Sequence, residues 1–434
     1  MNDLSLSDLK KSRNHFLTTG EAVWTSVLSS RWRTLWQWVP RLEVDTFEFP
    51  NHKACVDFIN KFLNCQIEFY LREFKLITGN HVSRYEPCLS RVIKHKIQHL
   101  QVDNKLGFRN IKIPLNQSVC ENLVCLKLHF ARLTDFESLS LPYLKIMYLE
   151  GVTFSRYVVV FDTPRLEYMS LIDYKFKRFL KIISMSGSVK VDIDVDFELM
   201  RHTLSERNII YNLLNNFSTV GDMTLSCKTL KLIYSIQHMN PLPKFRDLTR
   251  MRATMFLNAS LEVLPMVLES CPNMKHLTLE LVNDHPEAVV TKLSTVLSFC
   301  LVSSLESVEM ESPITEKATE KKLVRYFLDN ATSLKKLVLR LNLSHGEKQE
   351  PSLYKNLFDS PRRSSTFPNS SFEGKHLCGH YLLHCQQEVP ANKRPRTTES
   401  DSDSDIALDF SYGVALGFGL SLVVVAFRQQ LFSF

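Results

Sequence analysis

The sequence predicts an α/β fold in which short parallel strands stack into a curved repeat solenoid. One apolar pattern, L-x-x-L-x-L with other apolar residues allowed, recurs along the chain from about residue 97. Adjoining copies start 21 to 31 residues apart, the spacing of repeat proteins that add one strand and one return per unit. Later copies are separated by segments of helical periodicity, such as residues 206–217. Stacked strands then build a core that no single repeat could build alone.

The first element is a short helical unit that ends by residue 45. All four tryptophans of the chain lie in it, at Trp24, Trp32, Trp36 and Trp38. Thr18 and Glu21 fit a capping box that starts a helix, and Ser29 can cap a second one. Pro40 ends the unit because proline cannot continue a helix. The expected structure is two short helices with more aromatic surface than one helix pair can bury.

This segment resembles the second half of a plant F-box, whose pattern runs T-K-D-A-V-x-T-S-V-L-S-K-R-W-R-x-L-W-x-x-V-P-x-L-x-F-D. The matching residues include Ala22, Val23, Thr25, Ser26, Val27, Leu28, Ser29, Arg31, Trp32, Arg33, Leu35, Trp36, Val39, Pro40, Leu42 and Asp45. The resemblance implies that residues 1–45 form an F-box-like unit that docks a Skp-type adaptor of a cullin complex. The candidate adaptor-binding residues are Val23, Val27, Leu28, Trp32, Leu35 and Trp36. Apart from the resemblance, an ordinary amphipathic hairpin whose tryptophans are core is the alternative.

The first half of the family pattern, L-P-D-x-L-L-x-x-I-L-S-x-L-P, is degenerate in this chain. The sequence there reads MNDLSLSDLKKSRNHFL, which keeps Leu4, Leu6 and Leu9 but not the Leu-Pro entry or the Ile-Leu-Ser core. In the family, that helix supplies much of the adaptor contact. An F-box that no longer binds the adaptor is therefore the alternative interpretation.

Residues 46–95 are predicted to be a connector. Residues 55–62 have the pattern of a short helix, and residues 68–77 have that of a strand. Both fit a segment that docks onto the next domain.

Residues 96–263 carry leucine-rich repeats, and residues 264–341 continue them. Clear copies start at Ile97, Leu123, Leu144, Leu166, Val220, Met274, Leu305 and Leu334, and weaker ones lie near 191–195 and 248–253. The early returns are short and predicted to be irregular. The later returns are predicted helices at 206–217, 261–270 and 316–330. A generic α/β domain with chance leucine spacing is the weaker alternative, because one pattern recurs in so many copies.

Residues 264–341 also resemble the FBD domain that follows the repeats in plant F-box proteins. The family pattern contains C-P-N-L-K-x-L, then S-S-L-E-x-V, then E-x-x-L-V-x-Y-x-L-x-N-A-x-x-L-K-K-L. Matching residues include Cys271, Pro272, Asn273, Ser304, Leu305, Tyr326, Asn330, Ala331 and Leu334. By the order F-box, leucine-rich repeats, FBD, the chain is identified as a member of the plant F-box/FBD/LRR-repeat family.

The composition changes to a polar tail beyond residue 341. Residues 342–405 are predicted to be a flexible, disordered linker. Residues 365–385 resemble the end cap of plant leucine-rich receptor-like proteins, in which a membrane span follows. Residues 406–428 are the candidate transmembrane segment. Its apolar run of 16 residues, Tyr412 to Phe427, spans only about 24 Å of a hydrocarbon core of about 30 Å. A tail added from another gene family, or a gene-model artefact, is the alternative.

No motif for catalysis or metal binding is recognisable. The ten cysteines are dispersed without a CxxC pair, which argues against zinc. His95 and His99 lack an intervening glutamate, and Asp192, Asp194 and Asp196 alternate with apolar residues as in a strand, not a calcium loop. We therefore expect no catalytic residue, no metal and no cofactor. The net charge of +7 is too mild to indicate a nucleic-acid partner.

These features predict a binding adaptor and not an enzyme. The resemblance implies the substrate-recognition subunit of an SCF (Skp–cullin–F-box) ubiquitin ligase, which binds an unidentified target protein on the concave face of its repeats. The alternatives are a protein-binding scaffold with a non-functional F-box, soluble or membrane-tethered, and more remotely a receptor-like surface protein. No signal-peptide pattern is present, so cytoplasm or nucleus is expected, with a tail-anchored membrane protein as the alternative.

Overall fold

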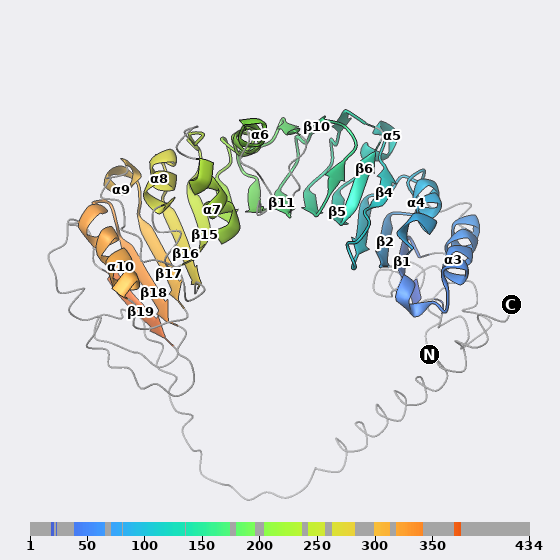
Figure 1. Ribbon diagram of the computed structural model, residues 1–434, viewed down its shortest axis with the longest axis horizontal. Helices are drawn as coiled ribbons and strands as arrows, with labels where there is room; N and C mark the ends of the chain where they lie inside the picture. Colours follow the sequence, from blue (N-terminus) through green and yellow to red (C-terminus); the bar gives the residue numbers. More distant parts are fainter. Residues whose placement is uncertain are drawn as a thin grey trace, which may run out of the picture. The chain divides into compact units, whose positions relative to one another are not determined.

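The computed structural model describes residues 19, 20, 23, 39–65, 71–79, 81–134, 136–173, 179–195, 204–236, 242–256, 263–282, 299–312, 318–341 and 369–374. All of them belong to one compact unit, residues 1–383, and a second unit covers residues 384–434. The described part is mixed α/β and is built on one long parallel sheet (Figure 1). None of the described helices is long and apolar enough to cross a membrane, and the candidate span at 406–428 lies outside the described residues.

The long sheet has thirteen strands that pair in the order in which they occur along the chain. They are β1 (Arg41–Asp45), β2 (Glu73–Thr78), β3 (His99–Asn104), β5 (Cys125–His129), β8 (Ile146–Glu150), β11 (Tyr168–Ile172), β13 (Lys190–Asp194), β14 (Asp222–Leu225), β15 (Arg250–Phe256), β16 (His276–Val282), β17 (Ser307–Ser312), β18 (Lys336–Leu341) and β19 (Asn369–Gly374). Every copy of the repeat pattern, weak or clear, is confirmed as a strand. The sheet also includes β1 and β2, which precede the predicted start of the repeats at residue 96.

The early returns form two small parallel sheets on the far side of the core. The strands β4 (Ile111–Pro114), β6 (Ala131–Thr134) and β9 (Thr153–Phe154) make one, and β7 (Ser138–Ser140), β10 (Val158–Asp162) and β12 (Phe179–Ile183) make the other. These returns were predicted to be irregular. They pair because successive short returns run side by side at a similar height, where their backbone groups would otherwise stay without partners.

Helices complete the returns elsewhere. They are α3 (His52–Cys65), α4 (Glu86–Val92), α5 (Gln117–Cys120), α6 (Leu204–Asn215), α7 (Cys227–Ile236), α8 (Val263–Ser270), α9 (Phe299–Ser303) and α10 (Ala318–Asn330), with single 3-10 turns η3 (Thr46–Glu48) and η4 (Val82–Arg84). The helices predicted near residues 55, 206, 261 and 316 are confirmed as α3, α6, α8 and α10. Figure 1 shows the labelled α-helices along one side of the long sheet. We call the other face of that sheet, which carries none of these helices, the open face.

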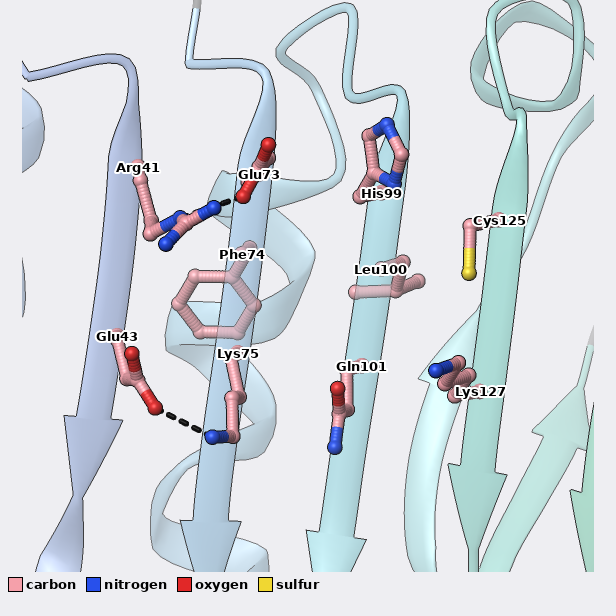
Figure 2. Close-up of a pocket in the computed structure, with 10 residues that line it drawn as sticks. All are labelled: Arg41, Glu43, Glu73, Phe74, Lys75, His99, Leu100, Gln101, Cys125 and Lys127. Atoms are coloured by element: carbon pink, nitrogen blue, oxygen red, sulfur yellow. Dashed lines mark hydrogen bonds and ion pairs between the residues drawn. The ribbon is translucent and has the colours of Figure 1, made fainter. Parts of the chain in front are cut away.

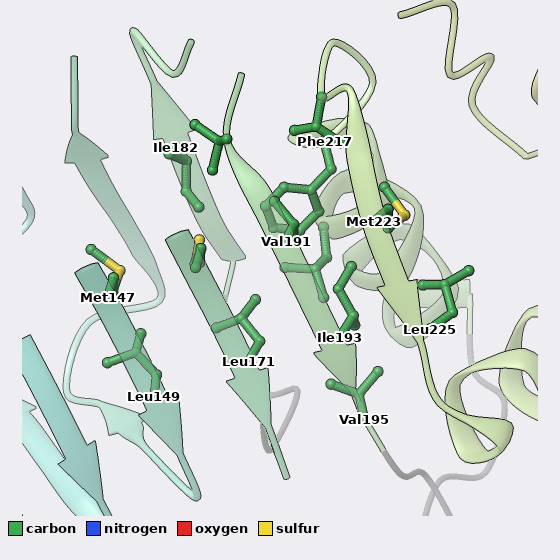
Figure 3. Packing of buried hydrophobic residues seen from close by; sticks show 14 of the residues in the cluster. Met147, Leu149, Leu171, Ile182, Val191, Ile193, Val195, Phe217, Met223 and Leu225 are labelled. Atoms are coloured by element: carbon green, nitrogen blue, oxygen red, sulfur yellow. The ribbon is translucent and has the colours of Figure 1, made fainter. Parts of the chain in front are cut away.

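The core lies between the long sheet and its returns. In each strand from β1 to β18, alternate residues point inward and are buried, such as Leu126 and Leu128 in β5 or Met147 and Leu149 in β8. Figure 3 shows these side chains in line across neighbouring strands, with Phe217 closing the layer from the return after α6. Complete burial of one such side chain stabilises the fold by about 1.5–3 kcal/mol. The alternation therefore determines which residues reach the open face.

A half-buried asparagine joins the helical returns to the small sheets. Asn216 follows α6, and its Nδ2 donates to the carbonyl oxygen of Leu180 at 2.7 Å. Its Oδ1 accepts from the backbone N–H of Ile182 at 3.2 Å. β12 is the terminal strand of its sheet, so Asn216 supplies the hydrogen bonds that a further strand would have made.

The chain leaves three successive strands through the same left-handed turn. Phe130, Gly151 and Asp173 follow β5, β8 and β11 with φ of 48°, 57° and 46°. The backbone N–H of each donates to the carbonyl at the end of the next strand, at 2.7, 2.9 and 2.9 Å. Only glycine adopts this conformation without steric cost, and a Cβ on Gly151 would lie 2.5 Å from the Phe130 ring. The turn is thus imposed by the inter-strand hydrogen bond even where the residue is not glycine.

Candidate functional site

The open face presents one side chain per strand in each of three rows. The first row contains Arg41, Glu73, His99, Cys125, Ile146, Tyr168, Lys190, Asp222, Arg250, His276, Ser307 and Lys336. The second row contains Glu43, Lys75, Gln101, Lys127, Tyr148, Ser170, Asp192, Thr224, Arg252, Thr278 and Glu309. The third row includes Asp103, His129 and Glu150. Charged, amide and aromatic groups dominate all three rows, which suits recognition of a polar partner surface.

A cavity of about 270 Å³ opens on this face between β1, β2, β3 and β5. Two ion pairs cross its β1–β2 side, Arg41 with Glu73 and Lys75 with Glu43 (Figure 2). The β3–β5 side carries Gln101 in register with Lys127. The cavity is smaller than most pockets for drug-sized ligands, which begin at about 300 Å³, and fits a single side chain better.

The middle of the open face holds two tyrosines that donate to carboxylates. Tyr148 donates to Glu150 at 2.9 Å and stacks on the His129 ring, 4.9 Å between centroids, while His129 Nδ1 lies 3.0 Å from Glu150. Tyr168 donates to Asp192 at 2.6 Å. Burial first, and then the Asp192 hydrogen bond and charge, raise the pKa of Tyr168 to about 12. Both hydroxyls therefore stay protonated at neutral pH and act as donors.

The C-terminal half of the open face is cross-linked by charges. Arg252 lies 3.3 Å from Glu280 and 3.6 Å from Glu311, and Arg340 lies 3.0 Å from Glu309 and 3.4 Å from Glu311. These pairs join β15, β16, β17 and β18. Because each charge has a nearby counter-charge, this region offers no strong excess of either sign to a partner.

The described residues offer little for catalysis. No group of three or more His, Cys, Asp or Glu side chains among them is placed to hold a metal ion. Burial raises the pKa of the Cys120 and Cys300 thiols to about 12, which leaves them protonated and poor nucleophiles.

Thr19 is anchored on the edge of the sheet. Thr19 is helical and fully buried. Its hydroxyl donates to the carbonyl oxygen of Arg41 at 3.0 Å and accepts from the N–H of Glu43 at 2.9 Å. β1 is the first strand of the sheet, so these are groups that no neighbouring strand pairs. The hydroxyl of Thr19 thus takes the place of a neighbour at the sheet edge.

Comparison with known proteins agrees with the repeat and FBD patterns. The FBD family model matches residues 299–339. The F-box/FBD/LRR-repeat protein At5g18770 of Arabidopsis thaliana is 56% identical over 417 aligned residues, which cover 81% of this chain and 86% of the relative. The FBD-associated F-box protein At5g18780 of the same plant is 46% identical, over 81% of this chain and 92% of the relative. The chain belongs to the plant F-box/FBD/LRR-repeat family.

Two residues of the FBD pattern in this family member tie neighbouring repeats together. Asn273 Nδ2 donates to the carbonyl oxygen of Arg246 at 2.8 Å, and Ser304 Oγ donates to that of Pro272 at 2.8 Å. The family-model match runs from α9 to β18. The pattern at residues 271–273 and 304 therefore has a structural reason, which is to fix one repeat on the next.

The F-box-like residues are only partly described. Val23 is helical and half-buried, and Val27, Leu28, Trp32, Leu35 and Trp36 lie outside the described residues. Adaptor binding by these six residues stays a prediction.

The open-face residues of this F-box/FBD/LRR-repeat protein were not named from the sequence. From β3 to β18 the repeat pattern contains the signal for them, because the residues that alternate with the buried leucines must face outward. β1 and β2 carry the same pattern, at Val39, Leu42 and Val44 and at Leu71, Phe74 and Leu76. Because these two strands were assigned to the helical unit and the connector, half of the cavity lining was missed.

Proposed function

We propose that this chain is the substrate-recognition subunit of an SCF ubiquitin ligase. The supporting observation is family membership, with relatives named as F-box proteins that align over most of both chains, together with the F-box pattern in residues 22–45. Residues 1–45 form the F-box helical unit and dock a Skp-type adaptor, which links the chain to the cullin complex. The adaptor-binding residues are Val23, Val27, Leu28, Trp32, Leu35 and Trp36.

The long sheet is a leucine-rich-repeat solenoid whose open face binds the target protein. Its rows of polar and aromatic side chains stand on a buried core, so the surface is rigid before binding, which limits the entropy lost on association. Ubiquitin transfer is carried out by the other subunits. This chain contributes proximity between target and ligase, and we place it in the cytoplasm or nucleus.

A pull-down of the full-length chain with a plant Skp-type adaptor tests the proposal. We expect binding at micromolar concentration and its loss in Trp32→Ala and Trp36→Ala. Phe108→Ala is the control, because Phe108 is an aromatic residue that is 88% exposed and lies outside the F-box-like unit. Circular dichroism and urea unfolding confirm that each variant is folded. Failure of the wild-type chain to bind the adaptor at micromolar concentration contradicts the ligase role.

The second candidate is a protein-binding scaffold without a ligase link. It is supported by the degenerate first half of the F-box pattern in residues 1–17. A chain that captures proteins through its open face but never retains the adaptor has this second function. Fractionation with and without residues 406–434 tests whether the scaffold is membrane-tethered, since a tail anchor would move only the longer chain to the membrane fraction.

A further inference from the structure

The cavity between β1 and β5 contains polar groups whose hydrogen-bonding capacity is unused. Gln101 and Lys127 pair in register on adjacent parallel strands, which stand about 4.8 Å apart. Figure 2 draws both side chains at the same level of the cavity, with no interaction between them or to the other residues shown. Within the described part of the chain, the structure gives neither polar head a hydrogen bond or ion pair. Lys127 is a half-buried residue, and its ammonium and the Gln101 amide are both available to a ligand that enters the cavity.

The nearest candidate counter-charges are already engaged. Glu43 is paired with Lys75 and Glu73 with Arg41. Lys127 also adjoins Tyr148 in the second row, but the carboxylate beyond it, Glu150, is held by Tyr148 and His129. Asp103, one row along on β3, lies 4.0 Å from the Lys105 ammonium. Among the residues that line the cavity, no acidic side chain is therefore left to pair with Lys127.

The net charge of the residues that line the cavity indicates which class of ligand it binds. Its lining includes Arg41, Lys75 and Lys127 against Glu43 and Glu73, which leaves one excess positive charge. Burial raises the pKa of the Cys125 thiol, so this sulfur adds no negative charge at neutral pH. One excess charge matches a monovalent carboxylate better than a phosphate monoester, which carries roughly −1.5 to −2 at pH 7.

We propose that this cavity binds a carboxylate, presented by an aspartate or glutamate side chain of the target protein, between the Gln101 amide and the Lys127 ammonium. The volume of about 270 Å³ fits one such side chain with part of its backbone. The inference rests on the proposed function, since it names the chemistry that the open face recognises in its target. An acidic residue in an extended segment can approach the cavity from the open face, on which none of the described α-helices lies.

The probe is a library of short random peptides displayed on phage, selected on the full-length chain. We expect selected peptides to share an Asp or Glu at one position. Selections run in parallel on Lys127→Gln, on Gln101→Met and on Lys181→Gln. Lys181 is an exposed lysine on β12, outside the cavity, so Lys181→Gln loses the same charge elsewhere. The acidic position should disappear with Lys127→Gln, weaken with Gln101→Met and persist with Lys181→Gln.

The best peptide is then synthesised with an amidated C-terminus and measured by fluorescence anisotropy. Replacing its acidic residue by the matching amide, or using Lys127→Gln, should weaken binding roughly tenfold or more, the loss of one charge-assisted hydrogen bond. A second peptide carries the amide in place of its acidic side chain and has a free C-terminal carboxylate. Its affinity reports whether a terminal carboxylate can bind in the cavity in place of the side chain. The proposal is overturned if no peptide is selected or if the selected peptides share no acidic position. It is also overturned if a phosphoserine peptide binds more tightly, or if Lys127→Gln binds the peptide as tightly as the wild type. These readouts do not involve the adaptor, so a negative pull-down affects only the ligase role.

Discussion

We predict that removing the Thr19 hydroxyl weakens the contact between Thr19 and β1. Thr19→Val keeps the shape of the side chain but removes the group that hydrogen-bonds Arg41 and Glu43 at 3.0 and 2.9 Å. Thr19 is 0% exposed, so water cannot replace the lost partner. An unsatisfied buried polar group costs about 1–3 kcal/mol. We expect a loss of about 2 kcal/mol in the free energy of opening of the contact between Thr19 and β1.

Hydrogen exchange at the Glu43 amide measures this directly, because its N–H donates to Thr19 alone on that edge of the sheet. A loss of about 2 kcal/mol corresponds to roughly 30-fold faster exchange by local opening. Thr19→Ser, which keeps the hydroxyl, should exchange within a few-fold of the wild type. Amides in β16, far along the sheet, should be unchanged in both variants. Unaltered exchange of Glu43 in Thr19→Val would refute the edge-capping role.

Three further perturbations test the returns, the turns and the charge network. Asn216→Ala leaves the Ile182 amide without its acceptor and should lower the urea-derived unfolding free energy by about 1–3 kcal/mol. Gly151→Ala places a Cβ 2.5 Å from the Phe130 ring at positive φ and should cost about 1–3 kcal/mol, whereas relief in Gly151→Ala/Phe130→Ala would identify the clash. The pKa of Glu309 is lowered, since burial, which raises it, is outweighed by a hydrogen bond from a lysine and the charge of an arginine on β18. Because the folded pKa is lowered, the Glu309 carboxylate contributes its full stabilisation above the unfolded pKa of about 4.3, and this stabilisation is lost as the pH falls through the folded pKa. Glu309→Gln should therefore lower the unfolding free energy at pH 7 and have the same stability as the wild type in acid. A pH-independent difference would exclude this linkage.

Much of the sheet can be predicted from the sequence because its signal is local. The inward residues of β5, Leu126 and Leu128, are buried, and apolar residues recur at the same two positions in the later strands of the long sheet up to β18. The small sheets of the returns lack such a signal. β9 is only two residues long, and short strands pair through backbone groups that leave no trace in side-chain type.

The cavity was missed because its two sides were assigned to different domains, although the strands on both sides carry the same repeat pattern. Lys127 lies in a recognisable repeat, but Arg41 and Glu43 follow the tryptophan-rich segment and were assigned to the helical unit. Their partners Glu73 and Lys75 lie 32 residues along the chain. Return lengths vary, so only the folded register shows that these four side chains form one wall.

The in-register rows have a consequence for what a partner must look like. Strands stand about 4.8 Å apart, whereas an extended peptide advances about 3.3 Å per residue. A peptide that crosses the strands therefore returns to phase after three of its residues and two strands, at about 10 Å. Peptide residues and strands therefore coincide only at this interval. A motif with anchor residues at every third position would meet every second strand, and inserting one residue between anchors would cost all the contacts beyond it at once.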